Sequence, residues 1–488
     1  MTSGSSNILK DAVSLVLEAA NKYPQRTAVE LHRESHTYQE LIETASGIAA
    51  YIRLQPDRCP FVGVVADKSF YCYASVLGVL MAGKAYLPLN PRFPEARNRY
   101  MVEKAGVNVV LDSALVKNIK PVSIFQAESR PTAYLLFTSG TTGHPKGVPV
   151  SHSNLAAYLH FMLKNYDFNH EDRFSQIFDL TFDLSVHDMF LAWASGACLC
   201  VPAENSSFVM SKFIREKEPT VWFSVPSLVN LMGRMRLLKQ DAFPSIRLSF
   251  FCGEALKTQT ALDWKQAASR SRMVNLYGPT EATIAITRYD LPHEPAFWKS
   301  ELGIVSIGRI FYGNSFKINK LSRNHDQGEL LLTGNQVVDG YFENEMADRT
   351  SFFIDHYTDK KFYRTGDLVR MDKDDDLFYI GRKDSEVKIS GYRVNLKEIE
   401  NLLETYETVN QAVVIYEQSD EEAENLKAFI LRSGEDNPKD DQELFAFCRE
   451  NLPWYMVPGK FIFVDDIPLN VNGKVDKTAL LKIFHHGK

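Results

Sequence analysis

The stretch Leu135–Val148 reads LLFTSGTTGHPKGV, and it says more about the fold than any other segment of the chain. An apolar run that suits a β-strand passes into a loop of small and hydroxyl residues, and Lys146 adds a positive charge near its end. Glycines let a backbone approach a phosphate closely, while amides and hydroxyls donate to its oxygens. Neither Gly140 nor Gly143 begins a GxxxxGK[ST] match, so the loop differs from the nucleotide P-loop. We therefore predict a phosphate-binding loop of another kind.

Short apolar runs lie on both sides of this loop, separated by stretches that favour helices. The runs are Val62–Ala66, Val107–Leu111, Ala133–Phe137, Val221–Val225, Leu248–Phe251 and Met273–Leu276. Strands that alternate with helices predict parallel α/β sheets, in which ligands bind beyond the carboxyl ends of the strands. The loops at Thr138, Pro226, Gly253 and Tyr277 are therefore expected to share one site.

The acidic stretch MDKDDD, Met371–Asp376, is interpreted as a solvated turn, and a compact second unit follows it. Asn395 and Glu398 have the spacing of a capping box at the start of a helix. The helical face is formed by Leu396, Ile399, Leu402, Leu403 and Tyr406, with strands expected at Ala412–Tyr416, Ala428–Leu431 and Phe461–Val464 and a helix around Leu444, Phe447 and Cys448. The predicted fold is α/β: a large N-terminal domain of mixed and parallel sheets flanked by helices, residues 1–383, plus a small mobile α+β C-terminal domain, residues 384–488.

The bulk composition excludes several classes of protein. The 488 residues carry a formal net charge of −6, which offers no basic surface for nucleic acid. The N-terminus lacks the pattern of a signal peptide, and the longest apolar stretch is too short to cross a bilayer as a helix. The six cysteines are scattered without a CxxC pair, as in a protein with reduced thiols. We expect a cytoplasmic monomer that binds neither membranes nor nucleic acid.

The phosphate loop resembles the signature loop of the adenylate-forming superfamily, which includes acyl-CoA synthetases, luciferases and the adenylation domains of nonribosomal peptide synthesis. Further segments resemble motifs of the same superfamily in the same order along nearly the whole chain. They are AGKAYLPLN (Ala82–Asn90), YGPTEAT (Tyr277–Thr283), YRTGDLVR (Tyr363–Arg370), GRKDSEVKISGYRVNLKEIE (Gly381–Glu400), LPWYMVP (Leu452–Pro458) and NGKVDK (Asn472–Lys477).

The resemblance implies an ATP site with Mg²⁺ and assigns residues to it. The β- and γ-phosphates would be bound by Thr138, Ser139, Gly140, Thr141, Thr142, Gly143 and Lys146. Tyr277 would stack on adenine, Asp367 would accept hydrogen bonds from both ribose hydroxyls, and Arg382 would assist at the ribose. Thr280 would approach the α-phosphate, and Glu281 would hold Mg²⁺, which neutralises phosphate charge.

The same resemblance implies two half-reactions that use different parts of the C-terminal domain. Lys474 would bridge the substrate carboxylate and the α-phosphate during adenylation, while the Lys388–Gly391 segment, with Lys388 as its catalytic residue, would face the thiol arm in the transfer step. Asp384 would be the hinge about which the domain turns between them.

The segment Ile177–Phe190 resembles the amino-acid-activating branch. Asp183 would pair with the substrate ammonium, which a fatty-acid enzyme has no reason to do; a helix-capping role is the alternative. The other pocket positions map onto Leu184, His187, Ser224, Phe250, Cys252, Gly253, Leu276, Ile284 and Ala285. Bulky side chains at 187, 250 and 276 predict a small substrate of the alanine, serine or glycine type.

FFCGEAL and YGPTEATIAIT resemble D-alanine:carrier-protein ligases most closely, with Cys252 at the position that lines the methyl pocket and favours the D-isomer. The sequence departs from that group at His187, where methionine is expected, at Asn90 and at Ile310. The histidine could admit a polar side chain or reshape the pocket floor. A role as a metal ligand is not indicated, because no partner has a suitable spacing.

Fourteen residues follow Lys474, and no GG[HD]S-like attachment site is found in the chain, so we expect a separate phosphopantetheinylated carrier protein. A cell-wall D-alanine ligase and a stand-alone loading enzyme of a biosynthetic pathway both fit this expectation. Two alternatives stay open: an acyl- or aryl-CoA ligase acting on an acid without an amine, and a catalytically inactive paralogue used for binding.

Overall fold

The computed structural model describes residues 9–32, 34–122, 131–139, 145–203, 207–320, 327–383, 386–417, 426–432, 440–468 and 475–486. The chain divides into two compact units. The first unit consists of Met1–Asn90, Val102–Phe137 and Gly147–Lys383, and the second of Pro91–Met101, Thr138–Lys146 and Asp384–Lys488. The second unit thus includes two segments that come early in the sequence.

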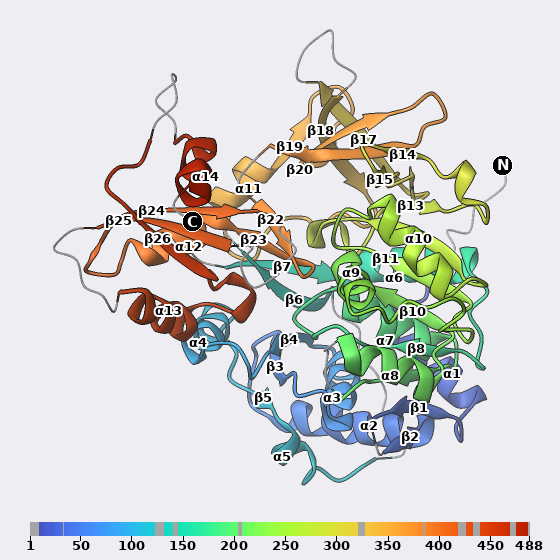
Figure 1. Cartoon of the computed structure of the whole chain (residues 1–488). Helices are drawn as coiled ribbons and strands as arrows, with labels where there is room; N and C mark the ends of the chain where they lie inside the picture. Colours follow the sequence, from blue (N-terminus) through green and yellow to red (C-terminus); the bar gives the residue numbers. More distant parts are fainter. Residues whose placement is uncertain are drawn as a thin grey trace. The chain divides into compact units, whose positions relative to one another are not determined.

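A nine-stranded mixed sheet forms the centre of the first unit (Figure 1). Its order is β16 (Arg309–Ile310), β13 (Thr287–Asp290), β12 (Arg272–Tyr277), β11 (Leu248–Phe251), β10 (Val221–Ser224), β8 (Arg173–Ser175), β9 (Cys198–Cys200), β1 (Thr27–Glu30) and β2 (Ser35–Thr37). The strands from β12 to β1 are parallel, and the outer strands pair antiparallel. This confirms the expected mixture of parallel and mixed sheets.

A second sheet of five strands has the order β5 (Val110–Leu111), β3 (Phe61–Val65), β4 (Ala85–Leu89), β6 (Thr132–Thr138) and β7 (Lys146–Ser151). Its neighbouring strands from β5 to β6 are parallel. Thr138 ends β6 and so belongs to this sheet and to the second unit, whereas Pro226, Gly253 and Tyr277 follow strands of the nine-stranded sheet. Pro226, Gly253 and Tyr277 thus lie at the same edge of one sheet, and Thr138 lies at the end of a strand in the other. The sequence pattern did not distinguish the two sheets.

Helices cover both sheets of the first unit. They are α1 (Ala12–Lys22), α2 (Tyr38–Leu54), α3 (Phe70–Met81), α5 (Ser113–Val116), α6 (His152–Asn165), α7 (Leu184–Ala194), α8 (Ser207–Lys217), α9 (Pro226–Arg234), α10 (Thr258–Ala267) and α11 (Glu345–Ser351), while α4 (Glu95–Lys104) continues from the second unit into the first. Every residue from Leu184 to Trp193 is buried, so α7 lies wholly within the core. No helix among the described residues is long and apolar enough to cross a bilayer.

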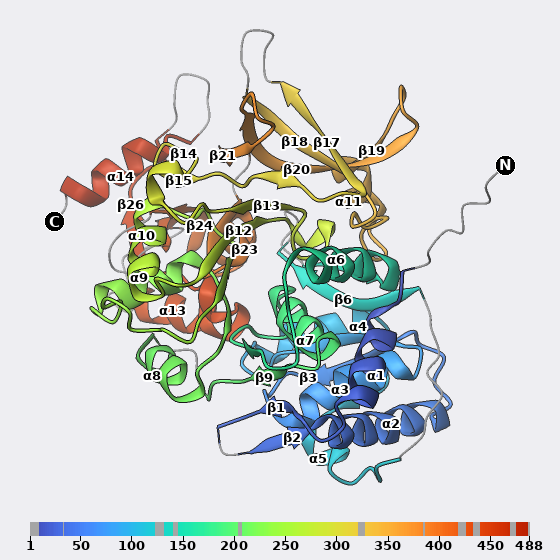
Figure 2. The same ribbon diagram turned by 90° about the vertical axis from the view of Figure 1, so that its right-hand side faces the viewer.

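An antiparallel sheet completes the first unit and is drawn at the top of Figure 2. Its strands are β17 (Asn314–Lys320), β18 (Gln327–Gly334), β20 (Lys360–Met371) and β19 (Phe352–Asp355), with β21 (Leu377–Arg382) paired to β20 and a small hairpin of β14 (Ser300–Glu301) and β15 (Ile304–Val305) nearby in sequence. The turn between β20 and β21 is the acidic stretch.

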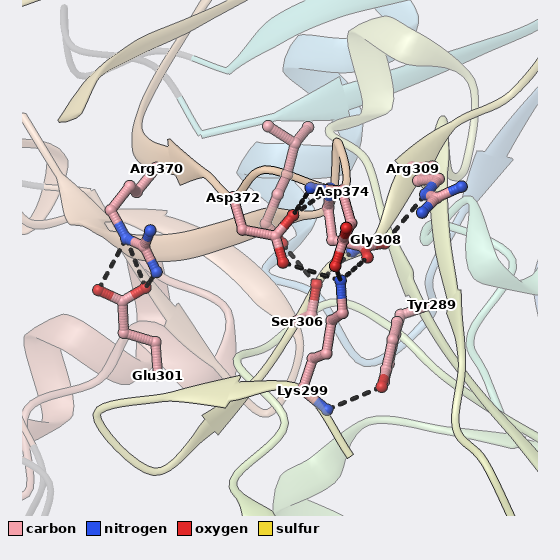
Figure 3. Close-up of polar contacts among 11 residues, drawn as sticks. Tyr289, Lys299, Glu301, Ser306, Gly308, Arg309, Arg370, Asp372 and Asp374 are labelled. Atoms are coloured by element: carbon pink, nitrogen blue, oxygen red, sulfur yellow. Dashed lines mark hydrogen bonds and ion pairs between the residues drawn. The ribbon is translucent and has the colours of Figure 1, made fainter. Parts of the chain in front are cut away.

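Three carboxylates of this turn lie around one ammonium group, and Figure 3 labels two of them, Asp372 and Asp374, near Lys299. Lys299 Nζ lies 2.8 Å from Asp372, 2.9 Å from Asp374 and 2.5 Å from Asp376. Asp372 also accepts hydrogen bonds from the backbone N–H groups of Asp374 and Asp376. The predicted turn is therefore present, but only partly solvated, because the Asp376 side chain is buried.

The second unit is an α+β body. Its strands are β22 (Glu386–Ile389) and β23 (Tyr392–Asn395) in one hairpin and β24 (Val409–Tyr416), β25 (Leu426–Arg432) and β26 (Lys460–Val464) in a sheet, with helices α12 (Leu396–Leu403), α13 (Asp440–Asn451) and α14 (Lys477–His486). Leu480 of α14 packs with Val413 and Phe429 on one face of the sheet. Asn395 caps α12 through Lys397 N, and the Glu398 carboxylate pairs with Arg97 at 2.9 Å. The strands and helices predicted for this region are present, but α12 ends at Leu403, so Tyr406 lies beyond the helix, and the cap that Asn395 makes is to Lys397 N instead of Glu398 N.

Candidate active site

The carboxyl edge of the nine-stranded sheet brings several predicted residues together. β8, β10, β11 and β12 run parallel, so the chain leaves all four strands at the same edge. Asp183 follows β8, Cys252 and Gly253 follow β11, and Leu276 and Tyr277 end β12. This edge is where an open α/β sheet binds its ligands.

A hydrogen-bonded triad lies at the end of β12. Tyr277 Oη donates to Asp367 Oδ2 at 2.5 Å, and Arg382 donates to Asp367 Oδ1 at 2.7 Å. Burial raises the pKa of Tyr277 well above its ordinary value, and the neighbouring Asp367 raises it further, so the phenol keeps its proton. The triad fixes a carboxylate that suits paired hydroxyl groups such as those of a ribose. The resemblance predicts that Tyr277 stacks on adenine. No sequence pattern indicates its hydrogen bond to Asp367, because the two residues are far apart in the chain.

Thr280 and Glu281 lie in a short 3₁₀ turn at Thr280–Ala282 directly after this strand. Glu281 is fully buried, and its Oε1 accepts a hydrogen bond of 2.7 Å from Tyr341 Oη. A carboxylate held in this way is the hard oxygen ligand that Mg²⁺ prefers, with phosphate oxygens able to supply further ligands. The residues present thus fit the predicted metal at this position.

The backbone after the 3₁₀ turn is strained. Thr283 and Ile284 both have positive φ, at 55° and 71°, a region that a β-branched side chain rarely adopts. Gln336 holds this strained segment: its Nε2 donates to Ala285 O at 2.7 Å, and its backbone carbonyl accepts from Thr283 Oγ1 at 2.6 Å. Strain of this kind persists only where the surroundings enforce it, as at functional loops. Gln336 was not singled out in the sequence, because a lone glutamine carries no pattern.

Asp183 is the N-cap residue of α7, but its side chain makes no capping hydrogen bond. The residue is 3% exposed, and its charge adds to the burial that raises the pKa of Tyr86 and of Tyr134. The carboxylate is therefore near Tyr86 of β4 and Tyr134 of β6, at the positive end of the α7 dipole. The missing capping bond argues against the capping alternative.

His187 lies one helical turn after Asp183, with Leu184 between them and also buried. Its ring centroid is 5.1 Å from that of Phe250 and 4.3 Å from that of Phe223. Phe223 pairs in register with Phe250, so both side chains point to the same face of the sheet. Phe223 is a neighbour of His187 that the sequence analysis did not name.

Ser224 points away from this group. Its hydroxyl accepts a hydrogen bond of 2.9 Å from Trp222 Nε1, and Trp222 stacks on Trp264 on the opposite face of the sheet. The Ser224 carbonyl accepts from the N–H of Cys252 at 3.4 Å, which joins the ends of β10 and β11. Ser224 therefore contributes backbone here, and the side chain that faces His187 is that of Phe223.

Cys252, Leu276 and Ile284 are all buried, and Gly253 has a positive φ of 84° that favours glycine. Cys252 is near enough to Tyr158 for a thiolate there to raise the pKa of that tyrosine further, beyond the larger effect of burial. Cys252, Leu276 and Ile284 belong to the same hydrophobic cluster as Phe250.

The second unit carries the remaining described site residues. Thr138 Oγ1 is buried and finds no partner within the described parts of the chain, and Lys146 is 8% exposed at the start of β7. A buried hydroxyl without a partner suits a hydrogen-bonding ligand, and a buried cation suits an anionic one. Ser139 Oγ donates to Arg393 O at 2.6 Å, which joins this segment to the hairpin bearing Lys388. A cavity of about 590 Å³ lies beside that hairpin and is lined in part by Ile389 and Ser390.

Some predicted residues cannot be placed. Gly140, Thr141, Thr142, Gly143, Asp384 and Lys474 lie outside the described residues. The roles expected of these residues in phosphate binding, in domain rotation and in adenylation therefore stay predictions from the sequence.

One group of thiols and a carboxylate in the described chain has the spacing of a metal site: Glu30, Cys198 and Cys200. The two sulfurs are 3.8 Å apart. Both oxygens of Glu30 already accept from cations, one from Lys217 at 2.6 Å and one from Arg173 at 2.5 Å. These fixed charges oppose a divalent ion, so we interpret the group as a structural ion pair beside two buried thiols.

Comparison with known proteins agrees with this geometry. A family model described as AMP-binding enzyme matches residues 16–129 and 112–342, and one described as the AMP-binding enzyme C-terminal domain matches residues 398–474. Zwittermicin A synthase ZmaJ of Bacillus cereus is 31% identical over 96% of this chain and 95% of its own length. Bacitracin synthase 1 of Bacillus licheniformis is 32% identical over 94% of this chain, which spans only 9% of that much longer protein.

Among solved structures, the adenylation domain AlmE of Vibrio cholerae, in complex with glycyl-adenosine-5'-phosphate, superposes with a TM-score of 0.86. The two chains are 27% identical and each is covered completely.

Proposed function

Because the chain belongs to the family of AMP-binding enzymes, we propose that it adenylates a small amino acid with ATP and then transfers it to the thiol of a separate carrier protein. In the first step, a carboxylate oxygen of the amino acid bonds to the α-phosphorus of ATP and pyrophosphate leaves. In the second, the carrier's sulfur bonds to the acyl carbon, AMP leaves and the thiol proton passes to solvent.

The observation that carries the amino-acid assignment is Asp183. It is a buried carboxylate at the N-cap of a buried helix, and it does not cap that helix. A carboxylate at such a poorly solvated position attracts an ammonium group strongly, because the two can form charge-assisted hydrogen bonds. Phe250, Leu276 and Cys252 are buried at the ends of β11 and β12, and their bulk supports a small substrate of the alanine, serine or glycine type. The relative AlmE, with its bound glycyl-adenosine-5'-phosphate, also supports a small substrate.

The ATP part of the proposal assigns roles to residues of this chain. Asp367, oriented by Tyr277 and Arg382, accepts from the ribose hydroxyls, and Glu281 would hold Mg²⁺. When bound, the metal neutralises phosphate charge. Thr138, Ser139 and Lys146 bind phosphate oxygens together with the loop that follows Ser139.

We also propose that residues 384–488 act as a lid that turns about Asp384. Lys474 serves adenylation in one position of the lid, and Lys388 serves transfer in the other. This part rests on the motifs that contain the two lysines. We therefore expect that the Lys474→Ala variant does not form the aminoacyl-adenylate. The variant should still transfer the aminoacyl group of a supplied aminoacyl-adenylate to the carrier.

The test of the proposed function is ATP–pyrophosphate exchange across D- and L-alanine, glycine, D- and L-serine, L-proline and simple acids without an amine. Exchange that requires a small amino acid supports it, and preference for D-alanine would assign the methyl pocket to Cys252. Exchange with acids that lack an amine, followed by transfer to free CoA, would contradict it and favour an acyl- or aryl-CoA ligase.

A further inference from the structure

His187 is a buried histidine for which the adenylation chemistry has no use. It is 0% exposed, and its ring is enclosed by Phe223, Phe250 and Tyr158. It lies four residues after Asp183, so both side chains share one face of α7. The imidazole is therefore a polar group set into an otherwise aromatic wall, one turn away from the carboxylate that is proposed to bind the substrate ammonium.

Only one of the two ring nitrogens has a partner. Nδ1 lies 2.6 Å from Tyr158 Oη, whereas Nε2 is buried and has no hydrogen-bond partner within the described residues. Burial lowers the pKa of His187 to about 3 and raises that of Tyr158, so both groups are neutral near pH 7. A neutral imidazole carries one proton, and its position depends on the bond at Nδ1.

The tautomer follows from counting buried groups without partners. If the Tyr158 hydroxyl donates to Nδ1, the imidazole proton is on Nε2, and that N–H is the one group left without an acceptor. If Nδ1 donates instead, both the tyrosine proton and the Nε2 lone pair lack partners. The first arrangement leaves fewer buried groups unsatisfied and is therefore favoured. Nε2–H is then an uncharged, buried donor that has no acceptor within the described residues.

From these contacts we infer that His187 Nε2–H donates to an oxygen on the β-carbon of the activated amino acid, so that the substrate is of the serine type. The inference rests on the proposed function and narrows it. Because the donor is uncharged, it neither repels the substrate ammonium beside Asp183 nor favours an acidic side chain. A polar site rejects an analogue that lacks the matching group, because the site's own donor is then left buried and unpaired.

The sharpest comparison is serine against 2-aminobutyrate, which has a methyl group in place of the hydroxyl. An unmet buried donor costs about 1–3 kcal/mol, so we expect the wild-type protein to prefer serine in kcat/KM by up to about 100-fold. Amino-acid-dependent pyrophosphate exchange on the full chain measures this ratio, with both enantiomers of each substrate tested. Alanine and glycine provide the smaller references.

Two variants of similar side-chain length separate hydrogen bonding from shape. His187→Met removes the donor, and the serine preference is expected to fall at least tenfold while exchange with 2-aminobutyrate is retained or improved. His187→Gln places an amide N–H near the position of Nε2 and is expected to recover part of the preference. Thermal unfolding midpoints of both variants show whether each is folded.

The outcomes are distinct. The inference would be overturned if the wild-type kcat/KM ratio of serine to 2-aminobutyrate is near one, or if His187→Met leaves that ratio unchanged in a folded protein. Either result would show that Nε2–H does not bind the substrate side chain. The proposed function would still stand. Failure of every amino acid to support exchange would instead overturn the proposed function itself. A high ratio that is lost in the methionine variant and partly restored in the glutamine variant supports the inference.

Discussion

At the scale of single residues, His187 makes the stability of the fold depend on pH. Its pKa is lowered by burial to about 3, against about 6.5 in the unfolded chain, so below pH 6.5 only the unfolded chain takes up this proton. Acid therefore removes stability through this group, by about 2 kcal/mol between pH 6.5 and pH 5. Urea unfolding of the wild type and of His187→Gln at both pH values should show a smaller acid loss in the variant. Equal losses would contradict the buried neutral histidine.

Asp367 gives a second prediction at this scale. Asp367→Asn removes the negative charge to which Arg382 donates a hydrogen bond of 2.7 Å, and it weakens the proposed contact with the ribose. Hydrogen bonds to charged groups contribute about 1.5–3 kcal/mol, so KM for ATP should rise roughly 10- to 100-fold. Tyr277→Phe, which removes only the phenol bond to Asp367, should have a smaller effect. A normal KM for ATP in the asparagine variant would exclude Asp367 from the nucleotide site.

At the scale of elements, Gln336 braces the strained loop that carries Glu281. Gln336→Leu leaves the carbonyl of Ala285 without its donor, so we expect a loss of about 2 kcal/mol in the free energy of unfolding and a lower kcat. Ile284→Gly, made in that background, should restore part of the stability, because glycine adopts positive φ without strain. Chemical unfolding and exchange rates measure both effects. Wild-type stability in the leucine variant would show that the loop needs no brace.

The acidic turn between β20 and β21 is a second element whose stability depends on one side chain. Burial raises the pKa of Asp372, but hydrogen bonds from Lys299 and from the backbone outweigh it, and the pKa is lowered below 3.8. Stability from this carboxylate is therefore present above pH 3.8 and is lost as the pH falls below it.

Lys299→Met leaves Asp372, Asp374 and Asp376 close together without their shared cation. We expect a loss of about 1 kcal/mol near pH 7, since such networks at partly exposed positions contribute modestly. Lys299→Arg keeps the charge and is the matched control. The difference in thermal unfolding midpoint between the methionine and arginine variants should be largest at pH 7 and should shrink as the pH falls below 3.8. A difference of the same size on both sides of this pH would point to packing instead.

The same elements show how far the sequence could predict the structure. Most strand and helix positions were predictable because apolar runs end at glycine or proline loops. The face of the sheet toward which each side chain points could not be predicted. β10 is buried on both faces, so its sequence VWFS shows no alternation of apolar and polar residues. Ser224 was therefore proposed for the pocket, whereas Phe223 faces His187. Contacts such as Gln336 with Ala285 join distant segments and leave no local pattern.

At the scale of the whole molecule, several of the proposed site residues of the first unit follow neighbouring parallel strands at one sheet edge. Asp183 and His187 on α7 lie after β8, Cys252 follows β11, and Tyr277 ends β12. The parallel order of these strands follows from the alternation of strands and helices, which is why the sequence could predict the shared edge. Thr138 ends β6, which belongs to the five-stranded sheet, and the composition of the strand could not show to which sheet it belongs.

The most direct test of the account is whether the carboxylate of Asp183 recognises the substrate amine. Pyrophosphate exchange is compared for the wild type and Asp183→Asn, with amino acids and their des-amino counterparts, such as alanine and propionate or serine and 3-hydroxypropionate. Breaking a buried charge pair costs about 3–5 kcal/mol, so kcat/KM for the amino acid should fall at least 100-fold while the weak reaction of the des-amino acid stays unchanged. Equal losses for both, or wild-type exchange that ignores the amine, would contradict the account.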